Sequence, residues 1–203
     1  MLSSHLLLAG AWIVYCVLHS VLASVTIKQV LQKKMPRFFR VYRFVYTLFA
    51  FFGLVAILFY QFNIHSALLF LPPIWMQYLG ALVMAAGALF MGMLIWKYFM
   101  QLSGVRWLYK EEVSNRLEIT GVHQYVRHPL YLGTFAFIWG WFLISPYICY
   151  LIACVIITVY TMIGLIFEEE KLILEFGDDY LQYMKNVPKI IPKFKKDAHP
   201  SPE

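Results

Sequence analysis

The chain has 203 residues, of which 61% are hydrophobic and only 14% are charged. A soluble domain of this size carries about 25% charged residues, so this composition excludes an ordinary soluble globular protein. Several apolar runs reach the roughly 20 residues that cross a bilayer core. We therefore predict an all-α, polytopic membrane protein, with a single domain over residues 1–192.

The net charge of +6 does not indicate a nucleic-acid partner, because the basic residues are grouped by position. They cluster after the first apolar run, between the third and fourth runs, and near the end of the chain. The segments 63–77 and 145–147 contain no Lys or Arg. This alternation is the positive-inside pattern. It predicts an N-terminus outside, a C-terminus and active site in the cytoplasm, and basic clusters that meet anionic lipid headgroups.

The first predicted membrane helix spans residues 5–27. No basic segment precedes it and no small-residue cleavage site follows it, so we expect a retained helix rather than a signal peptide. Its His19 is an ionisable residue inside a membrane span, which is by default a hypothesis of function. A neutral histidine that bonds to a neighbouring hydroxyl group explains His19 equally well.

The second and third predicted helices span residues 44–62 and 76–99. The third is rich in Gly and Ala, which let helix backbones approach closely in lipid, and we expect it to pack centrally. The three cysteines lie inside apolar runs and are predicted to be buried thiols. Their positions match neither a disulfide framework nor a metal site, and no metal is expected.

The fourth and fifth apolar runs, residues 130–144 and 148–167, differ from the others. Fifteen residues of helix cover about 22 Å, less than the roughly 30 Å of a bilayer core. The turn at Ser145-Pro146 predicts an antiparallel helical hairpin, which brings the total to about five membrane helices. The charged segment after residue 167 is expected to form a cytoplasmic cap, and the basic tail 193–203 to be disordered.

Polar chemistry is concentrated in two stretches, the loop 115–131 and the run of glutamates at 168–170. The hairpin places the start of its first helix beside the end of its second. Arg127, His128 and Tyr131 are therefore expected close to Glu168 and Glu169. Each stretch has an ordinary explanation, such as a snorkelling arginine, a proline at a helix start or a solvated acidic face. Together they are harder to explain, since carboxylates at a helix C-terminus oppose the helix dipole and need a compensating cation.

Two separated motifs carry a family resemblance over residues 115–192. One is G-x-x-x-Y-x-R-H-P-x-Y-x-G at 121–133, and the other is E-E-x-x-L-x-x-x-F-G-x-x-Y-x-x-Y at 168–183. At this spacing they resemble the isoprenylcysteine carboxyl methyltransferase superfamily, small integral-membrane enzymes that use S-adenosyl-L-methionine. The segment HSVLAS at 19–24 is similar to a branch that contains methanethiol S-methyltransferases and denitrification-associated membrane proteins.

The resemblance implies a set of site residues. Cofactor contacts are implied for Asn115, Arg116, Leu117, Glu118, His123, His128, Pro129, Leu130, Tyr131 and Glu168. Catalytic roles are implied for Arg127, His128, Glu168 and Glu169, in which a carboxylate balances the cationic amino acid part of the cofactor. His19, Tyr125 and His123 are the candidate substrate residues.

Two departures from the family pattern concern the methyl acceptor. His123 replaces the usual tyrosine, and Gly164 replaces an arginine that meets the substrate carboxylate in carboxyl methyltransferases. We therefore expect a small or lipophilic acceptor, with a thiol favoured, and His123 or His128 to assist its deprotonation. Three alternatives stay open: prenylcysteine carboxyl or lipid methylation, an NADPH-dependent sterol-type reductase, and a non-catalytic membrane assembly or transport protein.

Overall fold

The computed structural model describes residues 2–102 and 117–192. Over these residues the chain is helical, which confirms the predicted all-α class. The elements are α1 (Leu2–Ala23), α2 (Val25–Lys34), α3 (Pro36–Asn63), α4 (Ile74–Leu102), the 3-10 helix η1 (Gly121–Gln124), α6 (Pro129–Ile144), α7 (Ile148–Phe176) and α8 (Asp178–Asn186).

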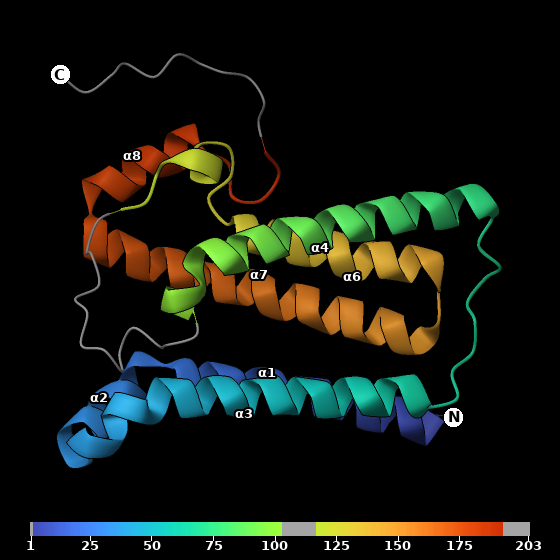
Figure 1. Ribbon diagram of the computed structural model, residues 1–203, viewed down its shortest axis with the longest axis horizontal. Coiled ribbons are helices and arrows are strands. Elements are labelled where there is room, and N and C mark those ends of the chain that lie inside the picture. The colour runs from blue at the N-terminus through green and yellow to red at the C-terminus, as the bar shows by residue number, and fades with distance from the viewer. Residues whose placement is uncertain (1, 103–116, 193–203) are drawn as a thin grey trace.

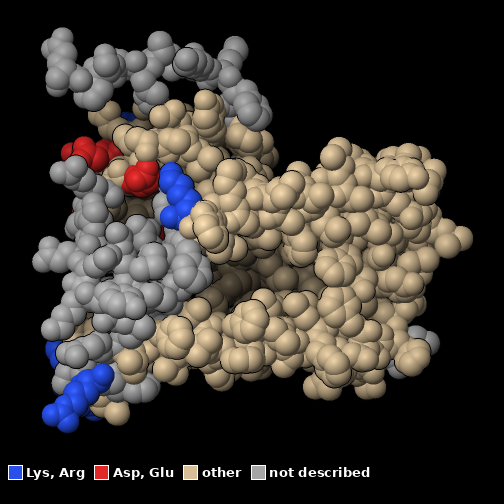
Figure 2. Space-filling view, viewed as in Figure 1, with Lys and Arg blue, Asp and Glu red and all other residues tan. Residues whose placement is uncertain are grey.

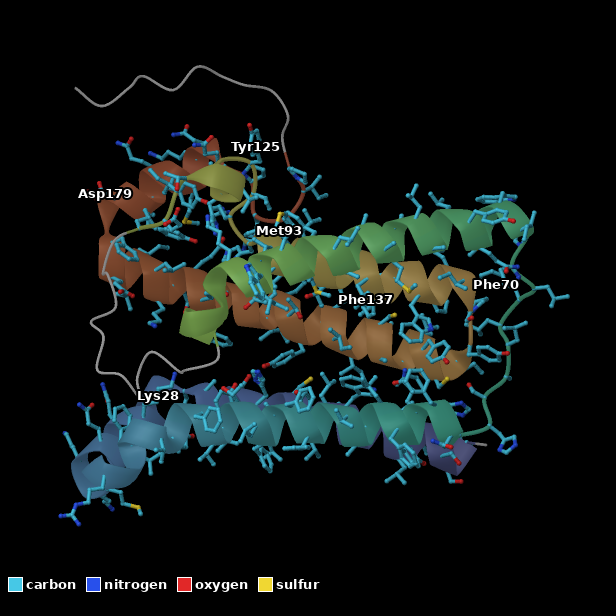
Figure 3. All side chains as sticks on the ribbon, in the orientation of Figure 1. Lys28, Phe70, Met93, Tyr125, Phe137 and Asp179 are labelled. Carbon is cyan, nitrogen blue, oxygen red and sulfur yellow. The ribbon has the colours of Figure 1, made fainter. Side chains whose placement is uncertain are left out.

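The long helices form two layers that run in a common direction (Figure 1). α1 and α3 lie side by side in one layer, while α4, α6 and α7 form the other. α1 packs against α7 and joins the layers. The amino terminus lies at one end of the bundle, and η1 and α8 lie at the opposite end. Figure 3 shows the same separation, with Tyr125 and Asp179 at one end and Phe70 at the other.

The predicted helical hairpin is confirmed in α6 and α7. Three residues connect the helices, and the Tyr147 N–H donates to the Ser145 carbonyl at 2.8 Å. The Pro146 carbonyl accepts a hydrogen bond from the Leu69 N–H at 2.8 Å, which ties the turn to the loop after α3. The start of α6 and the later part of α7 consequently lie at the same end of the bundle.

The central helix is α6, and the expectation that the glycine-rich third membrane helix would pack centrally is wrong. No residue of α6 is exposed. By contrast, Leu82, Leu89 and Trp96 of α4 are 69%, 76% and 86% exposed. The small residues of α4 allow this helix to pack closely against a single neighbour, α6.

Two pairs of glycines set the distance between α4 and α6. A Cβ atom at Gly80 would lie 2.8 Å from the Gly140 carbonyl oxygen, and one at Gly87 would lie 2.8 Å from the Gly133 carbonyl oxygen. Carbon and oxygen atoms do not pack this closely, so the two backbones are in direct contact. The pairing of 80 with 140 and of 87 with 133 also shows that the helices are antiparallel.

Two helix boundaries near the basic segment differ from the sequence prediction. α1 ends at Ala23 rather than at residue 27, because Ser24 is extended and its hydroxyl caps α2 by accepting the Ile27 N–H at 3.3 Å. α3 begins at Pro36 rather than at residue 44. Proline suits this first turn, where its missing N–H would have no helical partner. The basic segment is thus largely helical.

α7 continues past the expected end at residue 167 and stops at Phe176. Leu172 and Ile173 prolong its apolar face and pack against a buried cluster of tyrosines on α8. Gly177 then ends the helix with a φ of +56°, a conformation that favours glycine. Glu168, Glu169 and Glu170 therefore lie inside α7 rather than at its C-terminus, and the helix-dipole argument for a compensating cation does not apply to them.

Four helical stretches in the described part of the chain are long and apolar enough to cross a membrane: Leu2–Ala23, Phe44–Asn63, Ile74–Lys97 and Ile148–Phe176. α6 has 16 residues, and its length of about 24 Å is short of the roughly 30 Å core. α6 packs against α4 and α7, and none of its residues is exposed. The chain is a polytopic membrane protein.

Candidate active site

The Arg-His-Pro loop begins at a conformation that its sequence dictates. Gly121 has a φ of +62° and opens η1. His128 then forms the N-cap of α6, and Pro129 occupies the first turn. Since proline at this position fixes φ without losing a helical hydrogen bond, the chain turns directly from the loop into the central helix. Arg127 and His128 are thereby placed at the base of α6.

Backbone hydrogen bonds hold this loop against the segment that follows α8. The Arg127 N–H donates to the Pro188 carbonyl at 2.9 Å, and the His128 N–H donates to the Lys189 carbonyl at 3.1 Å. The hydroxyl of Tyr183 on α8 adds a bond of 2.6 Å to the His123 carbonyl. Main-chain hydrogen bonds therefore join the first motif to the segment after α8, and the Tyr183 hydroxyl joins it to the second motif.

Glu169 is a buried carboxylate surrounded by cations. Its side chain is 7% exposed. Oε1 lies 2.9 Å from Arg127 Nη1 and 3.3 Å from His128 Nε2, and Oε2 lies 2.7 Å from Lys189 Nζ. Two permanent positive charges thus balance one buried negative charge. This arrangement joins α7, the Arg-His-Pro loop and the chain after α8.

Glu168, the adjacent residue, is in a different environment. Its side chain is 42% exposed. One oxygen, Oε2, accepts the Tyr131 hydroxyl at 2.9 Å and lies 3.8 Å from His128 Nδ1. The expected proximity of the Arg-His-Pro-x-Tyr motif to the two glutamates is confirmed. The structure adds that Glu169 is enclosed by protein, whereas Glu168 is held in place and remains accessible.

Three buried polar atoms near Glu169 have no hydrogen-bond partner among the described residues: Arg127 Nε, Arg127 Nη1 and the Tyr180 hydroxyl. Nη1 is close to Glu169, but its N–H groups do not align with the carboxylate oxygen. Tyr180 is 1% exposed. Burial, followed by the charge of Glu169, raises the pKa of Tyr180 to about 12, so its hydroxyl keeps its proton. Arg127 also lies close enough to the Tyr180 hydroxyl to act on it as a donor, and that hydroxyl keeps its own proton free to donate.

Both histidines of the loop are shifted toward the neutral form. Burial lowers the pKa of His128 below its usual value, and the nearby Glu168 and Glu169 oppose this effect. Burial also lowers the pKa of His123, whose Nδ1 lies 3.2 Å from the Arg127 carbonyl oxygen. A neutral ring with a proton on Nδ1 can donate that bond, so His123 stabilises the turn of the loop.

The remaining cofactor residues implied by the family resemblance are spread over several environments. Pro129 is buried and Leu130 is partly buried at the start of α6. Leu117 packs against the tyrosine cluster of α8, whereas Glu118 is exposed and accepts a hydrogen bond from the Thr120 hydroxyl. Asn115 and Arg116 lie outside the described residues.

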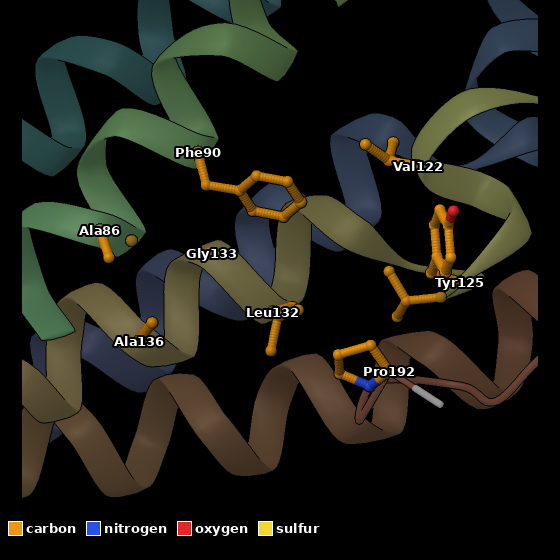
Figure 4. A pocket seen from close by; sticks show the side chains of 10 residues that line it. Ala86, Phe90, Val122, Tyr125, Leu132, Gly133, Ala136 and Pro192 are labelled. Carbon is orange, nitrogen blue, oxygen red and sulfur yellow. The ribbon is translucent and has the colours of Figure 1, made fainter. Parts of the chain in front are cut away.

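The candidate substrate residues are separated by α6. Tyr125 lines an apolar cavity of about 440 Å³ between α4, α6, the loop and Pro192 (Figure 4). Leu132, Gly133 and Ala136 form its α6 wall, and these residues share one face of the helix. Tyr131, which binds Glu168, points from the opposite face. His19 lies on the Glu168 side, where it contacts Tyr160 of α7.

Sequence reasoning missed Lys189 and Tyr180 as members of this site. The sequence groups Lys189 with the basic residues near the end of the chain, although its Nζ makes the shortest ion pair of Glu169. The signal in the sequence that could have identified Lys189 was its position between the second motif and Ile191-Pro192. The three cysteines are free and buried, as predicted. Among the described residues no group of three His, Cys, Asp or Glu side chains is placed to hold a metal ion.

Comparison with known proteins identifies the family. The sequence profile described as phospholipid methyltransferase matches residues 75–178, just over half of the chain. Methanethiol S-methyltransferase 1 of Bradyrhizobium diazoefficiens is 34% identical over 85 residues, which is 41% of this chain and 28% of that protein. Methanethiol S-methyltransferase of Crocosphaera subtropica is 30% identical over 102 residues, 48% of this chain and 39% of that protein.

The similarity to these curated relatives thus spans less than half of their length. A third relative, methanethiol S-methyltransferase of Pseudomonas deceptionensis, is 31% identical over 78 residues, 37% of this chain and 28% of that protein. No solved structure is significantly similar to the chain. The profile match includes nearly all of α4, all of α6 and α7, the first motif, and the second motif as far as residue 178. The chain belongs to the phospholipid methyltransferase family.

Proposed function

We propose that the chain is a membrane methyltransferase that uses S-adenosyl-L-methionine and methylates a small or lipophilic acceptor, with a thiol favoured. The observation that carries this proposal is the contrast between two adjacent carboxylates. Glu169 is enclosed by cations of the protein, whereas Glu168 is 42% exposed and fixed by Tyr131. An accessible, oriented carboxylate in a membrane protein suits a cationic ligand. Family membership and the methanethiol S-methyltransferase relatives support the same conclusion.

The residues of the candidate site fit the charged amino acid part of this cofactor. Glu168 offers a carboxylate to the ammonium group of the amino acid part. Arg127 Nε and the Tyr180 hydroxyl are buried donors without a partner among the described residues, and they suit its carboxylate. When bound, S-adenosyl-L-methionine supplies an electrophilic methyl group on a sulfonium centre.

The protein's part in such a reaction is to orient the reactants and exclude water. Tyr131 fixes one oxygen of Glu168 and thereby directs the other toward the ligand. α7 continues for eight residues beyond Glu168, about 12 Å, before α8 folds back at Gly177. Glu168 therefore lies inside α7, about 12 Å before this turn and close to the start of α6.

The test is cofactor binding by two matched variants of the glutamate run. We expect Glu168→Gln to lose thermal stabilisation by S-adenosylhomocysteine, because the amide cannot balance an ammonium group. Glu170→Gln is the control, since Glu170 is exposed two residues further along α7. In the wild-type protein a ligand at 100 times its Kd adds about 2.7 kcal/mol of stability.

Each result of this assay has a defined meaning. Full stabilisation of Glu168→Gln would contradict the role of Glu168. Stabilisation of the wild-type protein by NADPH instead would favour a sterol-type reductase. Stabilisation by neither compound would favour a non-catalytic membrane protein.

The apolar cavity in Figure 4 supports a second candidate, methylation of a lipid-like acceptor. Its volume of about 440 Å³ and its walls of Phe90, Leu132 and Pro192 suit a hydrocarbon chain. A panel of acceptors with labelled S-adenosyl-L-methionine separates the two candidates. We expect short thiols to accept the methyl group better than prenylcysteine carboxylates, because Gly164 provides no cation for a carboxylate. A preference for prenylcysteine or for a phospholipid amine would reverse this order.

A further inference from the structure

A polar and aromatic cluster lies between α1, α3 and α7, apart from the ion pairs of the loop. At its centre, His19 Nδ1 and Nε2 lie 2.9 and 3.0 Å from the Tyr46 hydroxyl oxygen. The rings of Tyr15, Tyr46 and Tyr160 surround the imidazole, with centroids 6.1, 5.4 and 6.4 Å away. Three elements thus converge on one ionisable group inside a membrane span.

This cluster is continuous with Glu168 along one face of α7. Tyr160, Gly164 and Glu168 are spaced by four residues, so they lie above one another on the helix. The Tyr131 hydroxyl reaches the same face of α7 from α6, where it donates a hydrogen bond to Glu168. The cluster and the accessible carboxylate therefore belong to one side of α6, about 12 Å apart along α7.

Open space beside Gly164 lies between the cluster around His19 and the carboxylate of Glu168. No heavy atom of the described residues lies within 4 Å of the position that a Cβ atom would take at Gly164. Figure 2 shows a hollow between the layer of α4, α6 and α7 and the helix α3. α3 contacts this layer near its C-terminal end, where the Phe62 ring lies against Trp141 of α6 and Tyr150 of α7. Gly164 therefore leaves room for a small molecule on this face of α7.

We infer that the space in front of Gly164 receives a thiol acceptor and that His19 removes the proton from the acceptor sulfur. This inference rests on the proposed function and names a catalytic residue and an acceptor class for it. The aromatic rings around His19 suit a small apolar thiol, and imidazole is the side chain best matched to proton transfer near neutral pH.

The two histidines expected from the sequence are less well placed for this step. His128 has a side-chain exposure of 5% and lies against both Glu168 and Glu169. His123 bonds within the loop, through its Nδ1 to the Arg127 carbonyl. His19 instead contacts Tyr160, which lies one helical turn before Gly164 on α7.

The reaction balances with the groups named. The acceptor S–H bond breaks and its proton moves to a ring nitrogen of His19. The sulfur forms a bond to the methyl carbon, and the bond from that carbon to the donor sulfonium breaks, with the electron pair staying on the donor sulfur. The products are a methyl thioether, neutral S-adenosylhomocysteine and a protonated His19, which loses its proton to solvent after product release.

The test compares two thiols that differ in acidity, with His19→Gln as the variant. Ethanethiol is almost fully protonated at pH 7, whereas pentafluorothiophenol is ionised and needs no base. We expect His19→Gln to lower kcat/KM for ethanethiol by about 100-fold or more, the usual contribution of a general base. For pentafluorothiophenol we expect little change. The variant should keep its thermal stabilisation by S-adenosylhomocysteine, because Glu168 and Tyr131 are intact.

A matched control comes from the same helix. His5 is also buried in α1 and bonds to Ser66 at 2.9 Å at the far end of the bundle. His5→Gln keeps a hydrogen-bonding side chain and should leave both rates unchanged. An equal loss for both thiols in His19→Gln, or no loss for ethanethiol, would overturn the role of His19. Wild-type protein that binds S-adenosylhomocysteine but methylates no thiol would overturn the acceptor class. Absence of binding would instead reject the proposed function itself.

Discussion

Two adjacent glutamates on α7 show that the surroundings of a single residue determine the role of its side chain. Glu168 and Glu169 point to different neighbours because consecutive helical residues are about 100° apart. Glu169 meets Arg127, Lys189 and His128, while Glu168 meets the Tyr131 hydroxyl and open space. One carboxylate is suited to hold the protein together, and the other to bind a ligand.

This contrast gives a prediction for stability. Glu169→Gln should destabilise the folded protein by roughly 3 kcal/mol or more, because removing one partner of a buried ion pair leaves the other charge uncompensated. Leaving Arg127 without its partner should cost more than leaving Lys189, because the Arg127 side chain is 8% exposed and that of Lys189 is 33% exposed. Thermal unfolding in detergent measures the effect.

Glu168→Gln serves as the comparison for this experiment. Its exposed carboxylate should contribute little to folding, so the unliganded variant should melt close to the wild-type temperature. Equal melting temperatures for Glu169→Gln and the wild-type protein would show that the ion pairs of Glu169 are not needed for stability.

The sequence predicted which residues meet at this site but not what each one does. The hairpin argument requires only the turn at Ser145-Pro146, so the proximity of Tyr131 to Glu168 followed from chain order. Which glutamate faces the cations depends on the rotation of α7 and on the path of the chain after α8. Lys189 reaches Glu169 only because the chain after α8 returns along the Arg-His-Pro loop.

At the level of elements, α6 is the helix on which the site depends. It carries Tyr131 toward α7 and presents Gly133 and Gly140 to α4 on the opposite face. A shift of α6 away from its position would therefore move Tyr131 relative to Glu168. The glycine contacts with α4 thus support the site from the face of α6 opposite to Tyr131 and Glu168.

A substitution at this interface tests the dependence. A Cβ atom at Gly140 would lie 2.5 Å from the Met84 backbone nitrogen and 2.9 Å from the Gly80 carbonyl oxygen. Both obstacles are backbone atoms, so α4 and α6 would have to separate. We expect Gly140→Ala to cost about 1–3 kcal/mol, the usual range for overpacking, and to lower the melting temperature.

Gly92→Ala is the matched control on α4. No described heavy atom lies within 4 Å of the position that a Cβ atom would take at Gly92, and alanine is the better helix former. This variant should melt at or slightly above the wild-type temperature. If Gly140→Ala behaved in the same way, the close contact between the two helices would not contribute to stability.

The hairpin was predictable because it follows from apolar run lengths and turn residues, and four of the five predicted membrane helices correspond to stretches long and apolar enough to cross a membrane. The central position of α6 and the length of α7 were not predictable. In a membrane, residues facing lipid and residues facing protein are equally apolar, so hydropathy does not tell a central helix from a peripheral one. The run that ends at Phe167 in hydropathy continues as an amphipathic helix to Phe176, where packing against α8 replaces lipid.

For the whole molecule, charge and chemistry are gathered at one end. On the face shown in Figure 2, the Lys, Arg, Asp and Glu side chains lie at the end that carries α2 and α8, and the opposite end shows none. The Arg-His-Pro loop and both glutamates belong to the charged end. By the positive-inside rule, we expect this end to face the cytoplasm, which would supply the S-adenosyl-L-methionine of the proposed reaction.

The orientation can be tested with single cysteines, because the three native thiols are buried. Leu71 is 86% exposed in the loop between α3 and α4, and Lys185 is exposed on α8 at the charged end. In intact cells we expect a membrane-impermeant maleimide to label Leu71→Cys but not Lys185→Cys. Opening the cells should make Lys185→Cys reactive, while the wild-type protein stays unlabelled throughout. The opposite pattern would place the candidate active site outside, away from the cytoplasmic supply of the methyl donor, and would contradict both the orientation and the assignment of the cofactor.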